Sequence, residues 1–99
     1  MPMQIKRTAV AGTMESSDIM ITLEAYDGGI EICLDSGVEK QFGDAIREVI
    51  RSTLNELGIT GARVTAVDKG ALDCAIRARV RTAACRASDE SYRWEGAKT

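Results

Sequence analysis

The chain has 99 residues, the size of one domain, and its 44% hydrophobic and 28% charged residues are ordinary for a globular protein. The formal net charge of -2 gives no general attraction to nucleic acid or to anionic membranes. No segment has the about 20 apolar residues of a transmembrane helix or the apolar run of a signal peptide, so we expect a cytoplasmic protein. The absence of histidine excludes Ser-His and Cys-His nucleophile pairs and imidazole metal ligands.

Two segments near the N-terminus carry the period-2 pattern of half-buried strands. In "DIMITLEA" (residues 18–25) and "IEICLD" (residues 30–35), apolar side chains alternate with mostly polar ones. The intervening "YDGG" is typical of a two-residue hairpin turn. We favour a turn centred on the two glycines, because the other register places Glu24 opposite Glu31.

The next segment, "SGVEKQFGDAIREVIRSTLNELG" (residues 36–58), predicts a helix. Ser36 and Glu39 have the spacing of a capping box, in which each side chain satisfies a free amide at the helix start. Gly58 can adopt the left-handed conformation that ends a helix. Between these signals an apolar stripe recurs at three- and four-residue steps, and its members are Val38, Phe42, Ala45, Ile46, Val49, Ile50, Leu54 and Leu57.

A third strand, residues 62–68, precedes a second helix within "GALDCAIRARVRTAACRA". Arg77 and Arg81 lie four residues apart on the polar face of this helix, where they are either solvated or available to a phosphate or a partner. Arg79 is closer to the apolar stripe and either snorkels or pairs with a carboxylate. The apolar positions at helical spacing are Leu72, Ile76, Val80 and Ala83.

The order strand, strand, helix, strand, helix predicts an α+β domain of two layers. A helix between the second and third strands favours a parallel pair, so we expect a small mixed sheet with both helices over one face. Residues 1–99 are expected to form a single domain with a flexible N-terminus (about residues 1–8). The polar C-terminal tail (about residues 88–99) carries Tyr92 and Trp94, which are suited to docking on this domain or on another chain.

Side chains that could carry chemistry are sparse. No glycine-rich loop has phosphate-binding spacing. The neighbouring carboxylates, Glu15 with Asp18 and Asp68 with Asp73, are interpreted as solvated loop acids because nothing marks a pocket around them. The three cysteines have unrelated spacings, and we expect reduced, buried thiols at Cys33, Cys74 and Cys85.

The stretch "VAGTMESSDIMI" (residues 10–21) sets two serines immediately before the first predicted strand. One interpretation is a turn in which Ser16 or Ser17 bonds the local backbone. The other is a modification site, since an exposed loop hydroxyl is accessible to a transferase that would supply the activating base. The residues alone leave both interpretations open.

Three separated segments, "VAGTMESSDIMI", "SGVEKQFGDAI" and "DKGALDCAIRARV", resemble the acyl carrier protein, or gamma subunit, of citrate lyase. The likeness covers residues 9–87, and in the tail only "YRWEG" is similar. The resemblance implies a non-catalytic carrier subunit. In that family the serine of the G-T-x-E-S segment carries a 2'-(5''-phosphoribosyl)-3'-dephospho-CoA group through a phosphodiester, and the matching position is Ser16. The next residue is commonly glycine in the family and is Ser17 here.

The resemblance also implies partners. The alpha subunit would exchange an acetyl group on the arm for citrate, and the beta subunit would cleave the resulting citryl thioester to oxaloacetate and a regenerated acetyl thioester. A prosthetic-group transferase would attach the arm, and citrate lyase ligase would acetylate it. The alternatives are the carrier subunit of citramalate lyase or of malonate decarboxylase, which uses the same group, or an unmodified interaction domain.

Strand alternation suggests a physical reason to prefer Ser16 over Ser17. If the extended backbone begins before residue 18, Ser17 shares the inward side of Ile19, while Ser16 points outward with Asp18. Only the outward hydroxyl would then be open to the transferase.

Overall fold

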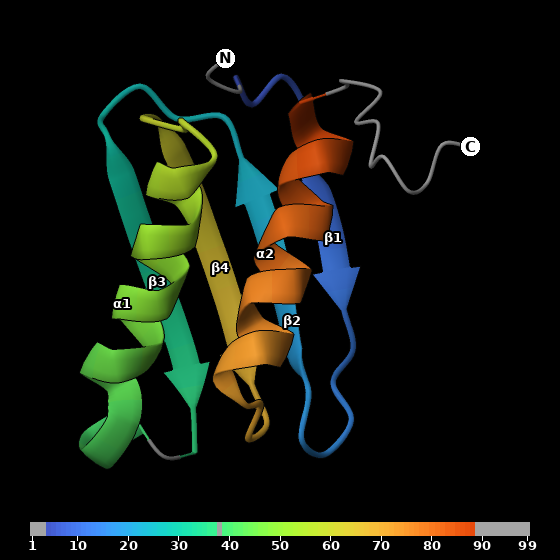
Figure 1. Cartoon of the computed structure of the whole chain (residues 1–99), viewed down its shortest axis with the longest axis vertical. Coiled ribbons are helices and arrows are strands. Elements are labelled where there is room, and N and C mark those ends of the chain that lie inside the picture. The colour runs from blue at the N-terminus through green and yellow to red at the C-terminus, as the bar shows by residue number, and fades with distance from the viewer. Residues whose placement is uncertain (1–3, 38, 89–99) are drawn as a thin grey trace.

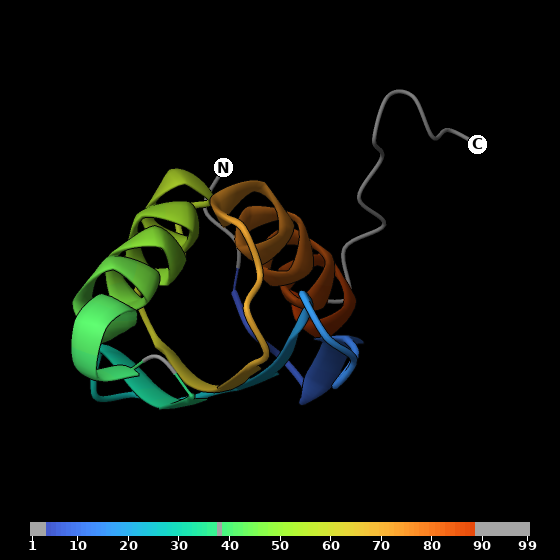
Figure 2. The same cartoon turned by 90° about the horizontal axis from the view of Figure 1, so that it is seen from below.

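The computed structural model describes residues 4–37 and 39–88. Its elements, in chain order, are β1 (Ala9–Gly12), β2 (Ile19–Glu24), β3 (Ile30–Ser36), α1 (Glu39–Glu56), β4 (Ala62–Asp68) and α2 (Asp73–Ser88). Both helices lie on the same face of a four-stranded sheet (Figure 1, Figure 2). The predicted two-layer α+β fold is confirmed, with β1 as an additional strand that is too short to show a periodic pattern.

The strand order in the sheet is β1-β2-β4-β3. β3 and β4, which α1 connects, form a parallel pair as predicted. β2 pairs with both β1 and β4 in antiparallel fashion. The predicted hairpin between residues 18–25 and residues 30–35 is wrong, because β4 lies between β2 and β3.

β4 occupies a central position, where its alternate residues are buried, and its Arg63 lies between two acidic side chains. Arg63 is in register with Glu24 on one side and with Glu31 on the other. Its guanidinium lies 3.9 Å from the Glu24 carboxylate and 2.9 Å from the Glu31 carboxylate. The insertion therefore replaces the repulsion of two facing glutamates, which made the hairpin register a concern, by two attractive pairs.

The core lies between the sheet and the helices, where burial of apolar surface supplies the main driving force for folding. The alternation predicted for β2 is confirmed, because every second residue of that strand is fully buried. The fully buried large apolar side chains are Ile19, Ile21, Leu23, Ile50, Leu54, Ile59, Val64, Ile76 and Val80.

The predicted helical stripes are correct at their centres and wrong at one end. Ile46 and Ile50 are buried, but Phe42 is 52% exposed and Leu72, which precedes α2, is 74% exposed. Phe42 lies in the first turn of α1 and Leu72 directly before α2, and the predicted stripe residue Ala45 is also exposed. Gly58 has the predicted left-handed conformation, with a φ of 77°.

Several smaller expectations have different outcomes. Ser36 is the last residue of β3, and the side chain of its proposed capping partner Glu39 lies outside the described residues, as do Val38 and residues 89–99 with Tyr92 and Trp94. The N–H groups of Lys6 and Arg7 donate to the carbonyl of Ala87 at 2.8 and 3.0 Å. The flexibility expected at both chain ends stays a prediction.

The cysteines are free, as expected, but Cys33 and Cys74 are exposed and Cys85 is half-buried. Cys33 lies on the face of β3 that the helices leave uncovered, because the strand alternates and its apolar residues face the helices. In the part of the chain that the structure describes, neither helix is long and apolar enough to cross a membrane.

Candidate functional site

Residues 13–18 form the loop between β1 and β2, and we call this segment the serine loop. It lies at the bottom of the view in Figure 1, at the end of the sheet where β3 and β4 finish. Ser16 and Ser17 are both exposed. Loops of this kind position reactive groups on a rigid scaffold, so the question is what fixes its shape.

The backbone of the serine loop continues the pairing of β2 with β4. The N–H of Ser17 donates to the carbonyl of Lys69 at 2.7 Å, and the N–H of Lys69 donates to the carbonyl of Asp18 at 2.8 Å. The N–H of Asp18 also donates to the carbonyl of Glu15 at 3.2 Å, which closes a turn around the two serines. The loop is therefore tied to the sheet at its C-terminal half.

The alternation argument that separated the two serines is wrong. β2 begins at Ile19, and Ser17 has a φ of 66° in the turn before it, so strand alternation does not extend back to the serines. This left-handed conformation is one that glycine adopts without the steric cost of a Cβ atom. It explains in physical terms why glycine is suited to position 17.

Asp18 is the carboxylate that organises the serine loop. The Arg79 guanidinium donates to both of its oxygens, from Nε at 3.0 Å and from Nη2 at 2.8 Å. The Thr13 hydroxyl donates to Asp18 at 2.6 Å, and the N–H of Ile19 donates at 2.7 Å. Bidentate pairing with arginine fixes orientation as well as charge.

These contacts set the charge state of Asp18. The hydrogen bonds from Arg79, from Thr13 and from the Ile19 amide hold the pKa of the Asp18 carboxyl well below its usual range. The Asp18 side chain is 14% exposed, so the expectation of a solvated acid is wrong here. A carboxylate with a low pKa and occupied oxygens is suited to holding the loop in shape and is a poor base.

Three of the four arginines of α2 form ion pairs, and they pair with two different carboxylates. Arg79 pairs with a carboxylate, which was one of the two predicted alternatives. Arg77 and Arg81 lie 3.8 and 3.2 Å from the carboxylate of Glu56, the last residue of α1. Their main contact is therefore between the helices, although both side chains are partly exposed.

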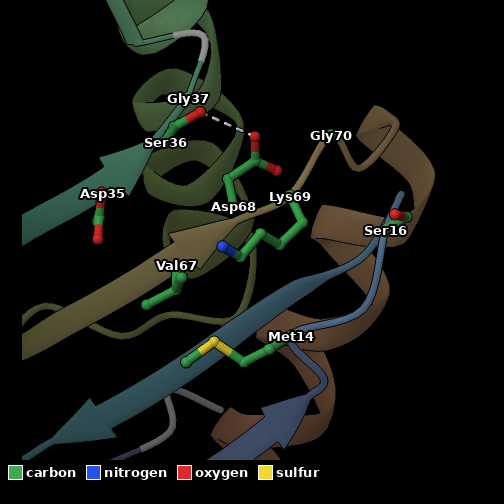
Figure 3. Close-up of a pocket in the computed structure, with 9 residues that line it drawn as sticks. All are labelled: Met14, Ser16, Asp35, Ser36, Gly37, Val67, Asp68, Lys69 and Gly70. Atoms are coloured by element: carbon green, nitrogen blue, oxygen red, sulfur yellow. Dashed lines mark hydrogen bonds between the residues drawn. The ribbon is translucent and has the colours of Figure 1, made fainter.

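A cavity of about 510 Å³ lies beside Ser16 at the carboxyl ends of β3 and β4 (Figure 3). It is lined by Met14 and Ser16 from the serine loop, by residues 35–37 and by residues 67–70. Ser17 is not among its lining residues. The carboxyl ends of adjacent parallel strands meet at one edge of a sheet, which is where α/β folds commonly form binding sites.

Asp68 joins the two strand ends within this cavity. Its carboxylate accepts a hydrogen bond from the Ser36 hydroxyl at 3.0 Å and another from the Ala71 N–H at 3.0 Å. Asp68 is buried, so the expectation of a solvated acid is wrong here too. Sequence reasoning missed Asp68 and Lys69 as neighbours of Ser16. The sequence feature that could have revealed them is the end of the predicted third strand at Asp68, because strand ends meet at one edge of the sheet.

Comparison with known proteins gives consistent relatives. A family model described as malonate decarboxylase delta subunit matches residues 6–87. The chain is 58% identical over 95 residues to the citrate lyase acyl carrier protein of Oenococcus oeni, covering 94% of this chain and 98% of that one. It is also 50% identical over 93 residues to the citrate lyase acyl carrier protein of Haemophilus influenzae, covering 94% and 97%.

A solved structure from Thermus thermophilus has a similar fold, with a TM-score of 0.57 at 13% sequence identity. The match covers 92% of this chain and 17% of that longer chain. At this level of identity the likeness concerns the fold alone.

Proposed function

Because the chain belongs to the family of citrate lyase acyl carrier proteins, it is a non-catalytic carrier subunit of a larger complex, and we propose that Ser16 carries its covalent prosthetic group. The observation that supports this assignment is the cavity beside the serine loop. Both serines are exposed, but Ser16 lines the cavity and Ser17 does not. The backbone of Ser17 is instead bound to Lys69 in a turn.

The group proposed at Ser16 is 2'-(5''-phosphoribosyl)-3'-dephospho-CoA, attached through a phosphodiester. When bound, it supplies a thiol on a long arm, which holds acyl groups as thioesters. The residues around Ser16 fit such an arm. The hydroxyl is exposed, and the cavity is open at Gly37, where an added Cβ atom would meet no other atom within 4 Å. Asp18 and Arg79 hold the loop so that the hydroxyl is presented from a fixed backbone.

The partners proposed for this carrier are the alpha and beta subunits of citrate lyase, the prosthetic-group transferase, and citrate lyase ligase, which acetylates the arm. Tethering keeps the bound acyl group at high effective concentration near the active sites of these partners. In this proposal the partner subunits catalyse every reaction, and this chain contributes only the hydroxyl to which the arm is attached. The work of the complex as a whole would be cleavage of citrate to acetate and oxaloacetate.

A second candidate is the carrier subunit of malonate decarboxylase, which the description of the matching family model favours. It would use the same group on the same Ser16, so the site is common to both proposals. Assays of the modified chain with the subunits of each enzyme complex would separate them, because only the correct partners would turn over their substrate with it.

The attachment is tested by intact mass after incubation with the transferase. Wild type is expected to gain the mass of the group once, Ser16→Ala to gain nothing, and Ser17→Ala, the matched control in the same loop, to be modified fully. Peptide mass spectrometry then locates the group. A group found on Ser17, or a fully modified Ser16→Ala protein, would refute the assignment.

A further inference from the structure

The cavity beside Ser16 contains a lysine whose position the serine loop itself fixes. Lys69 follows β4 directly, and its N–H and carbonyl are the two groups that bind Asp18 and Ser17. Two residues of the serine loop, Ser17 and Asp18, thus face the single residue Lys69, as in a β-bulge. The backbone of Lys69 is therefore held one residue away from the proposed attachment point.

The side chain of Lys69 reaches into the cavity on the open face of the sheet. Alternation along β4 puts Asp68 on the helix side, where it is buried, and Lys69 on the opposite side with Val67. Figure 3 shows the Lys69 side chain extending toward Val67, while Ser16 lies on the other side of the Lys69 backbone, so the flexible stem of Lys69 must swing to reach a group on Ser16. The ammonium group is exposed and mobile enough to follow a ligand, because it ends a flexible four-carbon stem.

The charge of Lys69 has no partner within the described residues, whereas Arg79, which also contacts the serine loop, is bound to Asp18 through both carboxylate oxygens. No ion pair joins Lys69 to any described carboxylate, and among the described residues that line this cavity Lys69 is the one with a cationic side chain.

Two carboxylates share the cavity with Lys69. Asp68 is engaged by the Ser36 hydroxyl and the Ala71 amide. Asp35 is exposed and opposes Val67 across the β3–β4 pair. An anion entering here would be repelled by both acids, so it requires the positive charge of Lys69 beside it.

We propose that Lys69 binds the phosphodiester that joins the arm to Ser16, and so holds the first part of the arm in the cavity. This inference rests on the proposed attachment. A phosphodiester carries a full negative charge at neutral pH, and a lysine is a common partner of phosphate. The carboxylates limit the strength of the contact, while the covalent tether supplies the high local concentration that makes a weak contact effective.

The test measures the reactivity of individual lysines with an amine-acetylating reagent, by peptide mass spectrometry, in unmodified protein and in protein carrying the arm. Lys69 is expected to react about fivefold more slowly once the arm is attached, which corresponds to about 1 kcal/mol of contact. Lys6 is the matched control in the same molecule, because it is exposed and bound through its backbone to Ala87 at the other end of α2. Its rate is expected to stay unchanged.

The salt dependence of the Lys69 reaction rate distinguishes an ion pair with the phosphate from steric shielding of Lys69 by the arm. At about 1 M salt, where screening acts over about 3 Å, the protection of Lys69 is expected to disappear. Protection that persists at this salt concentration would overturn the proposed charge contact. Equal Lys69 rates in the two forms, with intact mass showing complete modification, would overturn it while leaving the Ser16 assignment in place. Absence of the mass gain in wild type would instead overturn the attachment, and this inference with it.

A second measurement uses the phosphorus resonance of the phosphodiester in protein carrying the arm. Lys69→Gln is expected to shift this resonance and Lys69→Arg to restore most of it, whereas Lys6→Gln leaves it where it is. Because Lys69 is exposed, none of these variants is expected to alter the melting temperature. An identical resonance in wild type and Lys69→Gln would contradict the proposal.

Discussion

Gly12→Ala should destabilise the protein through a collision that the backbone cannot avoid. Gly12 is the last residue of β1, directly before the serine loop, and its φ is 99°. A Cβ atom added there would collide with the carbonyl oxygen of Ile19 and approach the Cα atom of Met20 at 3.2 Å. Gly12 is paired with Met20 in the sheet, and the obstacle is backbone, so neither side can move away cheaply.

The size of this effect follows from two contributions. A positive φ costs a residue with a Cβ atom about 1 to 2 kcal/mol, and forcing extra atoms into a packed site costs about 1 to 3 kcal/mol. The free energy of unfolding should therefore fall by about 2 to 5 kcal/mol in Gly12→Ala. Gly29→Ala separates the two contributions, because Gly29 has a φ of 97° and its added Cβ atom would meet nothing within 4 Å. It should lose only about 1 to 2 kcal/mol.

Urea unfolding of wild type and both variants measures these free energies. The transferase reaction on the folded fraction gives a second readout, because a displaced Gly12 alters the chain entry into the serine loop. Gly12→Ala is expected to be modified more slowly than Gly29→Ala. Equal losses of stability in the two variants would show that the collision with Ile19 is relieved, and would refute the reasoning.

Three further outcomes are expected. Arg79→Gln should speed hydrogen exchange of the Ser17 and Lys69 amides and slow modification of Ser16, and Arg79→Lys should restore part of both. Arg77→Gln should change neither rate. Unchanged exchange in Arg79→Gln would count against the role of the ion pair. Because the native pKa of Asp18 is lowered, its stabilising contribution is present above the ordinary value of 3.8 and is lost as the pH falls toward the native pKa. Acid titration of stability should therefore be shallower for Asp18→Asn over that range than for wild type, and parallel curves would contradict this. Ser17→Gly should raise the free energy of unfolding by up to about 1 kcal/mol in urea titrations, since it relieves a positive φ at some cost in chain entropy, and a clear loss would show that the Ser17 side chain makes a needed contact.

Sequence reasoning succeeded where one element carries its own signal. The alternation of Ile19, Ile21 and Leu23 specified β2 and its buried face, and the stripe through Ile46 and Ile50 specified α1. It failed where the outcome depended on which strands become neighbours. The pairs that Arg63 forms with two glutamates suit that order, but exposed pairs are too weak to decide it, and no local pattern reports which strands become neighbours.

The candidate site shows the same division. The serine loop was visible as a motif, but its shape depends on residues far along the chain. Arg79 could be given two alternatives from its place on a helix, and choosing between them required knowing that Asp18 faces that helix. Lys69 gave no local signal at all, because its importance comes from backbone pairing with the serine loop.

The anchoring of the serine loop by distant residues has a consequence for the order of events in the cell. The loop takes its shape from Lys69 and Arg79, so a nascent chain that ends before them has the serines without the geometry that presents them. We therefore expect attachment of the arm to follow synthesis and folding of α2, and chains that fail to fold to remain unmodified. The transferase would then modify only chains in which the serine loop has already folded against β4 and α2.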